Sequence, residues 1–379
     1  MDRRDFFCLL AFLPLAFGPG CKASHIRRSV AAGRHLAEGS VSGAATAAVP
    51  GTGVPGVDSL LRAQLKKMVD RLIQEWGDEK VPSDKEYVKY TDDYRTRAII
   101  NFANGKIRVE TVEDKNRKEK LRTAIIHTLL TPEDPAQVDL TSAEQVKIGE
   151  KPFLYNLVLD RDGEPIRWEW RANRYAEYLM DNALREDTYN ERRRMYVTFE
   201  MVGSHDKEQQ KRYSDHVLRN SRRFDVNPDL IYSIIEVESS FNPYAMSPVP
   251  AYGLMQIVPE TAGRDAYQLI HKRKGTPSRD YLFIPANNIR LGTAYLHLLD
   301  QKYLKEIKNP RSREYCVIAG YNTGSGNVLR SFAPDRERAL KRINAMDSTQ
   351  VYRHLVRNLP YAETRRYLPK VVRARRKYA

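Results

Sequence analysis

Residues 227–241 carry the pattern that most constrains the fold: a capped helix whose apolar face contains a glutamate. Asn227, Pro228 and Asp229 supply an N-cap, a proline at the first helical position and an acid in the first turn. Apolar side chains then recur every three or four residues, as on one face of a helix, at Leu230, Ile231, Ile234, Ile235 and Phe241. Glu238 falls within this stripe.

A carboxyl group on the apolar face of a helix is poorly solvated. Because burial disfavours the charged form, we expect the pKa of Glu238 to be raised, which suits a general acid. Glu236 lies about 200° away around the helix axis, so we expect it to face solvent and not to act as a partner carboxylate. From spacing alone, a structural role in which Glu238 caps a buried polar contact stays open.

Three further motifs follow Glu238 in the chain. The ordered set is Glu238-Ser-Ser-Phe-Asn-Pro, Gly253-Leu254-Met255-Gln256, Ala319-Gly320-Tyr321-Asn322 and Glu363-Thr364-Arg365-Arg366-Tyr367. In this order they resemble the motifs of lytic transglycosylases with a goose-type lysozyme-like (SLT) domain, over roughly residues 210 to 379. The segment YVKYTDDYRTRAIINFANGKIRVETV resembles the extra amino-terminal domain of the membrane-bound lytic murein transglycosylase C family.

The resemblance implies cleavage of the β-1,4 bond between N-acetylmuramic acid and N-acetylglucosamine in peptidoglycan, without water, to give a 1,6-anhydro end. Ordinary glycosidases need two carboxylates flanking the bond, whereas here the substrate's acetamido group can stabilise the cation at C1. Glu238 would protonate the leaving oxygen and then accept the proton of the C6 hydroxyl, which attacks C1 intramolecularly. Two alternatives stay open: a non-catalytic peptidoglycan-binding lipoprotein, and a true lysozyme that admits water, with Glu363 as a second carboxylate.

Other site residues carry over from the family motifs as expectations. Tyr321 is expected to be catalytic, with its hydroxyl approaching the acid. Substrate-binding residues are expected at Ser239, Ser247, Met255, Gln256, Asn322, Glu363 and Tyr367. From the residues alone, Met255 fits equally well as a core filler, Tyr321 as a packed aromatic with a satisfied hydroxyl, and Glu363 as a surface partner of Arg366.

The amino terminus indicates export. Arg3 and Arg4 precede a short apolar run, Phe6 to Phe17, which is too short to span a bilayer and is typical of a signal-peptide core. Residues 1–20 are therefore expected to be a signal peptide, and the following Cys21 resembles the lipidated cysteine of a lipoprotein. The arginine pair also resembles a twin-arginine signal, so the export route stays open. The family resemblance suggests a periplasm-facing protein anchored by lipid to the outer membrane.

The remaining chain is long enough for two domains after a tether. Residues 21–57 are rich in small residues and predict a flexible tether. Residues 58–204 predict an α+β domain, with helices at 58–76, 117–130 and 171–184, and strands at 98–103, 106–112, 153–159 and 194–202. Asn104-Gly105 is a hairpin signal between the first two strands. Helical periodicity beyond His205 predicts a mainly α, lysozyme-like catalytic domain over residues 205–379.

The first domain offers little chemistry of its own, so scaffolding, glycan or stem-peptide binding, and docking of a partner stay open. The net charge of +15, from 63 Lys and Arg against 48 Asp and Glu, favours anionic partners such as stem peptides or lipid head groups. No nucleic-acid motif accompanies it, so nucleic acid is not an expected partner. The 8 histidines are scattered and Cys316 has no partner cysteine nearby, so no cofactor, metal or disulfide is expected. We expect a monomer.

Overall fold

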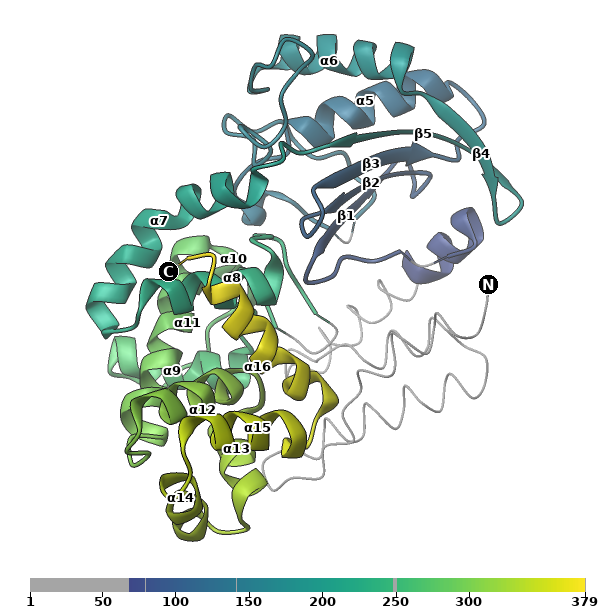
Figure 1. The fold of residues 1–379 in the computed structure, drawn as a ribbon. Coiled ribbons are helices and arrows are strands. Elements are labelled where there is room, and N and C mark those ends of the chain that lie inside the picture. Colours follow the sequence, from purple (N-terminus) through teal and green to yellow (C-terminus); the bar gives the residue numbers. More distant parts are fainter. Residues whose placement is uncertain (1–67, 79, 141, 248–250, 379) are drawn as a thin grey trace.

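The computed structural model describes residues 68–78, 80–140, 142–247 and 251–378. The chain forms a sheet part (residues 68–204) and a helical part (residues 205–378), and helix α7 (His205–Phe224) runs from one to the other (Figure 1). The predicted signal peptide, Cys21 and the predicted tether lie outside the described residues. No helix within the described ranges has the length and apolarity that crossing a bilayer needs.

The sheet part is built on one antiparallel five-stranded sheet in the order β1-β2-β3-β5-β4. Its strands are β1 (Glu86–Thr91), β2 (Thr96–Asn101), β3 (Lys106–Thr111), β4 (Arg185–Tyr189) and β5 (Arg192–Glu200). The predicted β2–β3 hairpin is confirmed, with Asn101 opposite Lys106 and Gly105 at a φ of +71° in the connection.

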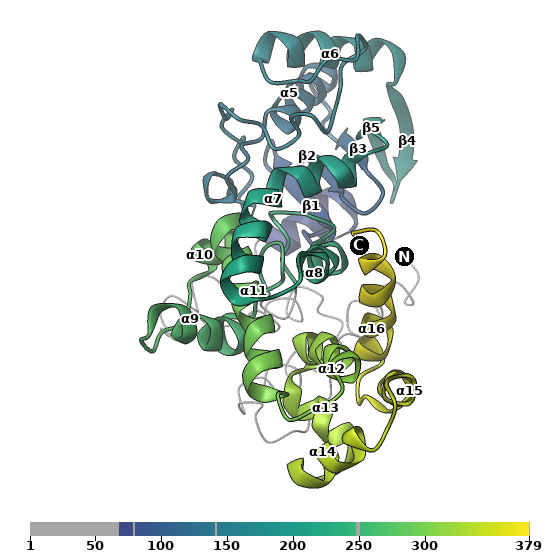
Figure 2. The ribbon, with the colours of Figure 1, turned by 60° about the vertical axis from the view of Figure 1, so that its left-hand side comes forward.

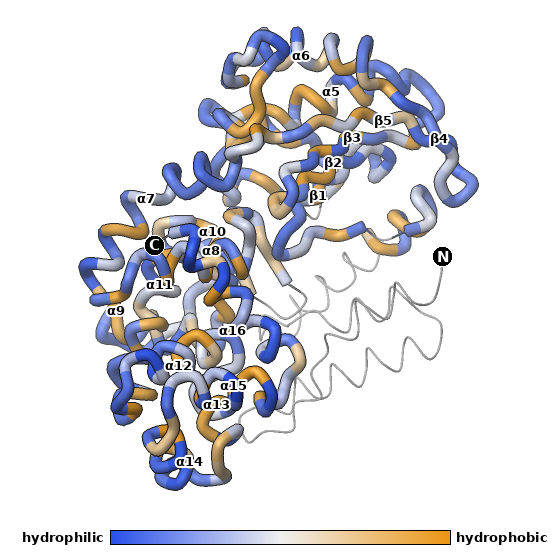
Figure 3. The backbone as a smooth tube through the Cα atoms, viewed as in Figure 1, coloured by the Kyte–Doolittle hydropathy of each residue, from blue (hydrophilic) through white to orange (hydrophobic). Residues whose placement is uncertain are grey.

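Helices cover one face of the sheet. α5 (Arg117–Leu129) packs on β2, β3 and β5, and α6 (Glu169–Asn182) packs on α5 (Figure 1). Figure 3 shows hydrophobic residues concentrated along the strands and on α5, between the hydrophilic outer surfaces. Both helices fall within a few residues of their predicted positions, because each carries an apolar stripe facing the core of the sheet part.

The opposite face of the sheet has its own small core. Residues 68–76 are helical, and Trp76 packs with Val88 and Tyr90 of β1. Arg97 is buried beneath the Trp76 ring, 3.9 Å from its centroid, and forms an ion pair of 2.6 Å with the buried Glu110. A buried charge needs such a partner.

One predicted strand is wrong. Residues 153–159 form a series of turns, although Phe153, Leu154, Leu157 and Val158 are all buried as the apolar run suggested. A short apolar run predicts that the residues are buried, but it does not distinguish a strand from a series of turns. Strands β1 and β4 were not predicted at all.

The helical part confirms the mainly α prediction. α8 (Pro228–Ser239) is largely buried, and packs against α7 and the last helix, α16. The other helices follow in chain order: α9 (Arg264–His271), α10 (Arg279–Phe283), α11 (Pro285–Leu298), α12 (Pro310–Thr323), α13 (Ser325–Phe332), α14 (Arg336–Asn344), α15 (Ser348–Asn358) and α16 (Ala362–Arg375). Short π-helical turns occur at Pro259–Gly263 and Leu299–Tyr303, and a 3₁₀ turn occurs at Pro135–Gln137 in the sheet part.

The two parts are packed together where the chain leaves α8. Tyr244 belongs to the helical part in sequence, but its ring lies in the core of the sheet part, 5.1 Å from the Tyr87 ring and 5.4 Å from the Phe153 ring. Its hydroxyl donates to the carbonyl of Pro132. Arg212 of α7 donates to the carbonyls of Phe153, at 2.7 Å, and Tyr155, at 2.9 Å. The sheet part is thus fixed against the segment that follows Glu238.

Candidate active site

Helix α8 carries Glu238 in its last turn. The Asn227 side chain accepts from the backbone N–H of Asp229 at 3.0 Å and Pro228 occupies the first turn, as predicted. The helix ends at Ser239 because Ser240 and Phe241 adopt φ values of +50° and +63°. Glu238 is partly buried, so its carboxyl group combines poor solvation with access from outside.

The carboxyl of Glu238 has a raised pKa. Burial raises it to about 7, and the negative charges of Glu363 and Asp84 act in the same direction. Tyr367 and Lys85 oppose the shift, because a hydrogen bond or a cation favours the carboxylate. The Tyr367 hydroxyl donates to Oε1 of Glu238 at 2.7 Å. A carboxyl group with this pKa exists in both protonation states near neutral pH, as a residue that is first acid and then base requires.

Glu236 is directed away from this site. Its carboxylate forms an ion pair of 2.6 Å with Lys377 and accepts from the Tyr378 hydroxyl at 2.7 Å. The expectation that Glu236 is not a partner carboxylate of Glu238 agrees with this geometry, although Glu236 faces the carboxy-terminal residues and not open solvent.

Two tyrosines lie near the acid. Tyr367 of α16 makes the hydrogen bond to Glu238, whereas the Tyr321 hydroxyl of α12 donates to the carbonyl of Met255 at 2.8 Å. Burial, with the added effect of the Glu238 charge, raises the pKa of both phenols well above the usual value. Both therefore stay protonated and act as hydrogen-bond donors. Of the two, Tyr367 makes the hydrogen bond to the acid, while Tyr321 lies close enough to be affected by its charge.

The structure does not place the side chains of Ser239 and Met255 where they can bind substrate. Ser239 is fully buried, and its hydroxyl donates to the carbonyls of Leu254, at 2.8 Å, and Ile235, at 3.1 Å. Met255 is also fully buried, and its side chain packs directly over Gly292 of α11. Ser239 and Met255 point into the core, whereas the adjacent residues Glu238 and Gln256 are only partly buried. Both side chains pack behind the acid and the turn instead.

The Gly253–Gln256 turn is held by a residue that sequence reasoning missed, Asn288 of α11. Its Oδ1 accepts from the Met255 N–H at 2.8 Å, and its Nδ2 donates to the carbonyls of Tyr252, at 2.7 Å, and Leu282, at 2.8 Å. Gly253 has a φ of +72°, and a Cβ there would lie 2.6 Å from the Leu282 carbonyl oxygen and against the Asn288 amide. Only glycine fits this position.

Two more predicted residues, Gln256 and Asn322, make hydrogen bonds within the helical part. Gln256 is partly buried and its Nε2 donates to the carbonyls of Ala245, at 3.1 Å, and Gly253, at 3.0 Å. Asn322 accepts from the Thr364 hydroxyl at 2.6 Å, which ties α12 to α16.

Two further predicted residues, Glu363 and Ser247, differ in their exposure. Glu363 is exposed, and no ion pair with Arg366 or another cation is found for it among the described residues. Its charge instead contributes to the raised pKa of Glu238. Ser247 is partly buried, and its N–H donates to the Ala251 carbonyl at 3.2 Å.

The sheet part contributes two charged groups that sequence reasoning did not assign to the site. Asp84 and Lys85 precede β1, and the charges of both act on Glu238. They are more than a hundred residues from Glu238 along the chain, so no local pattern signals the contact.

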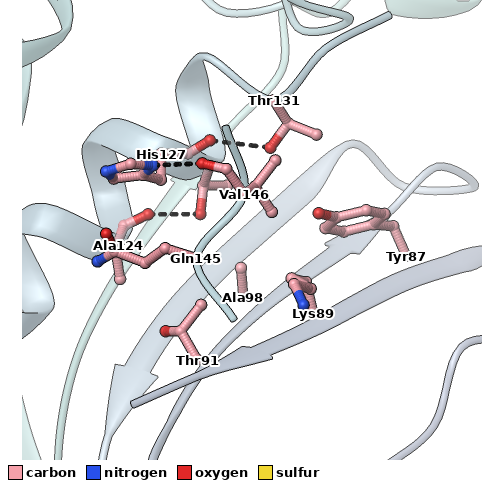
Figure 4. Close-up of a pocket in the computed structure, with 10 residues that line it drawn as sticks. Tyr87, Lys89, Thr91, Ala98, Ala124, His127, Thr131, Gln145 and Val146 are labelled. Atoms are coloured by element: carbon pink, nitrogen blue, oxygen red, sulfur yellow. Dashed lines mark hydrogen bonds between the residues drawn. The ribbon is translucent and has the colours of Figure 1, made fainter. Parts of the chain in front are cut away.

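A small cavity lies elsewhere in the sheet part. It has a volume of about 20 Å³ and is lined by residues that include Tyr87, Lys89 and His127 (Figure 4). This volume holds about one water molecule and no sugar ring. In the described part of the chain, no group of three or more His, Cys, Asp or Glu side chains is arranged to hold a metal ion.

Both parts of the chain match families of known proteins. The family model described as "Membrane-bound lytic murein transglycosylase C, N-terminal domain" matches residues 57–213, and the "Transglycosylase SLT domain" model matches residues 215–344. The chain is 46% identical over 322 residues to the membrane-bound lytic murein transglycosylase C of Sodalis glossinidius, which covers 84% of this chain and 89% of that protein. The membrane-bound lytic murein transglycosylase C of Yersinia enterocolitica is 46% identical over 306 residues. That match covers 80% of this chain and 85% of the Yersinia protein.

Among solved structures, the 70 kDa soluble lytic transglycosylase of Escherichia coli is 28% identical, with a TM-score of 0.34. That match covers 45% of this chain and 25% of the Escherichia coli protein.

Proposed function

The chain belongs to the membrane-bound lytic murein transglycosylase C family, and we propose that Glu238 is the single general acid and base of its reaction. The chain is an enzyme of the lytic transglycosylase class and acts on murein. The observation that supports the assignment of Glu238 is its raised pKa, about 7, in a partly accessible position where Tyr367 holds one carboxyl oxygen. This combination suits a group that must donate a proton in one step and accept one in the next.

In the first step, protonated Glu238 donates its proton to the glycosidic oxygen between N-acetylmuramic acid and N-acetylglucosamine. The C1–O bond breaks, the N-acetylglucosamine end leaves as an alcohol, and positive charge develops at C1. The substrate's acetamido group stabilises that charge. Tyr367 stabilises the carboxylate that forms, because its hydrogen bond to Oε1 is stronger when the acceptor is charged.

In the second step, the C6 hydroxyl of the same muramyl residue attacks C1. The Glu238 carboxylate accepts the hydroxyl proton, the O6–C1 bond forms, and the product carries a 1,6-anhydro end. The attack is intramolecular, so the effective concentration of the nucleophile is high and water is not needed. Glu238 is again protonated and ready for another cycle.

We propose substrate contacts for Ser247, Gln256, Asn322, Glu363 and Tyr367. Tyr321 is proposed to act by fixing the Met255 carbonyl, to which its hydroxyl donates. Ser239 and Met255 are proposed to position the acid and the turn from within the core.

The placement of the enzyme is also a proposal. We propose that residues 1–20 are a signal peptide, that Cys21 is lipidated, and that residues 21–57 tether domains 58–204 and 205–379. The relatives are named membrane-bound, and the apolar run before Cys21 supports an exported, lipid-anchored protein. A periplasm-facing position at the outer membrane brings such a monomer to peptidoglycan. The excess of basic residues favours the carboxylates of the stem peptides.

The reaction type is tested by digesting purified sacculi in water enriched in oxygen-18 and measuring the masses of the released fragments. The proposal predicts anhydro-ended fragments that contain no oxygen-18 at C1. Reducing-ended fragments that carry the label would show hydrolysis and contradict the proposal. Binding to sacculi without any released fragment would favour a binding protein.

A further inference from the structure

Lys85 of the sheet part reaches the end of the helix that carries Glu238. Its Nζ donates to the carbonyl of Glu236 at 2.9 Å and to the carbonyl of Val237 at 2.6 Å. Both carbonyls belong to the last turn of α8, at the negative end of the helix dipole, and the Glu236 carbonyl also accepts from the Ser240 N–H at 2.9 Å. Figure 2 shows α8 below β1, and Lys85 directly precedes the first residue of β1, Glu86.

The backbone that carries Lys85 is fixed to the chain that leaves α8. The Asn242 side chain donates to the Asp84 carbonyl at 3.3 Å, and the Met246 N–H donates to the Ser83 carbonyl at 3.4 Å. With Tyr244 inserted in the core of the sheet part, these bonds fix the backbone from which the Lys85 side chain extends to α8.

The charge of Lys85 acts on Glu238. Burial lowers the pKa of Lys85 to about 8, while Asp84, Glu238 and Glu236 raise it and Lys370 lowers it further. Because the Glu236 carboxylate is paired with Lys377 and Tyr378, it is already satisfied. The charged or titratable groups that act on Glu238 or on Lys85 are Asp84 before β1, Glu236 of α8, Tyr321 of α12, and Glu363, Tyr367 and Lys370 of α16.

We propose that Lys85 is a positioning residue for glycosidic cleavage: its ammonium group fixes the last turn of α8 and stabilises the carboxylate form of Glu238. This inference rests on the proposed function for its catalytic meaning. The proposal gives the sheet part a role in the reaction. The sequence alone leaves scaffolding, ligand binding and docking of a partner open as roles for this part.

Lys89 is a matched control. It lies four residues further along, in β1, and its Nζ likewise donates to two carbonyls, those of Asp139 and Ser142, each at 2.7 Å. Burial lowers its pKa to about 8 as well. Figure 4 shows Lys89 at the small cavity under α5, and it is absent from the groups that act on Glu238.

The test uses the full chain with Lys85→Met, Lys85→Gln, Lys85→Arg and Lys89→Met. Glutamate carboxyl groups are labelled with carbon-13 and titrated by NMR, and Glu238→Gln identifies the signal of Glu238. The release of anhydro-ended fragments is measured over the same pH range. The Lys85→Gln variant keeps an N–H donor but lacks the charge. It therefore allows the effect of the charge to be measured even where Lys85→Met does not fold.

Loss of the Lys85 charge is expected to raise the titration midpoint of Glu238 by about one pH unit, since a nearby cation commonly shifts a carboxyl by this amount or more. The alkaline limb of the activity profile should move in the same direction, and the maximal rate should fall about tenfold. Lys85→Arg should keep the wild-type midpoint. Lys89→Met should lower thermal stability and leave the midpoint unchanged.

An unchanged midpoint in Lys85→Gln would overturn the proposal. An equal shift in Lys89→Met, or a shift in Lys85→Arg as large as in Lys85→Gln, would do the same. The NMR titration does not depend on activity, so a wild-type protein that releases no anhydro-ended fragments would contradict the proposed function separately.

Discussion

The hydroxyl of Tyr367 donates a hydrogen bond of 2.7 Å to Oε1 of Glu238, and joins the last helix of the chain to the helix that carries the acid. Burial alone would leave a carboxyl group protonated over a wide pH range. The Tyr367 bond and the Lys85 cation limit that shift, so the pKa of Glu238 is about 7. A residue that must first donate and then accept a proton needs such a balance.

Tyr367→Phe removes the hydrogen bond and leaves the ring in place. We expect the pKa of Glu238 to rise, since the lost bond favours the carboxylate, and the rate to fall about 10- to 100-fold. The alkaline limb of the activity profile should move to higher pH. Tyr378→Phe is the matched control, because Tyr378 donates a bond of equal length, 2.7 Å, to Glu236. A limb that moves equally in both variants would argue against a specific effect of Tyr367.

Glu238→Gln should stabilise the protein in a pH-dependent manner. The folded-state pKa of Glu238, about 7, lies above the ordinary value of 4.5, so ionisation opposes folding. At pH 4 the group is protonated in both states and costs nothing. As the pH rises from 4.5 to 7, ionisation of Glu238 increasingly lowers the free energy of unfolding of the wild type. Above pH 7 this loss reaches roughly 3 kcal/mol at most.

Thermal unfolding at pH 4 and pH 8 measures this effect. The melting temperature of Glu238→Gln should exceed that of the wild type clearly at pH 8 and little at pH 4. The same difference at both pH values would mean that the pKa of Glu238 is not raised on folding.

Gly253→Ala should disrupt the turn beside the acid. Its φ of +72° strains any L side chain, and an added Cβ would meet the Leu282 carbonyl at 2.6 Å and the Asn288 amide. We expect a loss of about 3 kcal/mol or more in the free energy of unfolding, measured by urea denaturation. Gly163→Ala provides the control, because Gly163 has a φ of +80° but no atom within 4 Å of an added Cβ. Gly163→Ala should lower the free energy of unfolding by only about 1 kcal/mol. Equal losses in Gly163→Ala and Gly253→Ala would contradict the steric argument.

Local sequence signals predicted α8 well. The N-cap Asn227, the first-turn Pro228 and the apolar stripe lie next to one another in the chain, so they predict both the helix and the raised pKa of Glu238. The β2–β3 hairpin was predicted for the same reason, from Asn104-Gly105 and the flanking apolar residues.

Strand β1 shows why other elements were missed. Tyr87 faces the core under α5, and Val88 and Tyr90 face the core around Trp76, so both sides of the strand are buried. Lys89 is buried too, with its ammonium on two carbonyls. Burial on both faces removes the alternation that identifies a half-exposed strand.

The contacts around the acid depend on tertiary structure. Lys85 reaches α8 only because the two parts pack together through Tyr244, which no spacing in the sequence reports. The buried positions of Ser239 and Met255 have the same origin, since the motif fixes their order in the chain but packing against Leu254 and Gly292 fixes their direction.

The most direct test of the role of Glu238 compares Glu238→Gln with Glu236→Gln on purified sacculi. The release of anhydro-ended fragments is measured by mass spectrometry. Glu238→Gln should reduce the rate by about 10²- to 10⁴-fold, the usual contribution of a general acid and base. Glu236→Gln should stay within a few-fold of the wild type, because Glu236 faces Lys377 and Tyr378. Near-normal release of anhydro-ended fragments by Glu238→Gln would contradict the central role of Glu238.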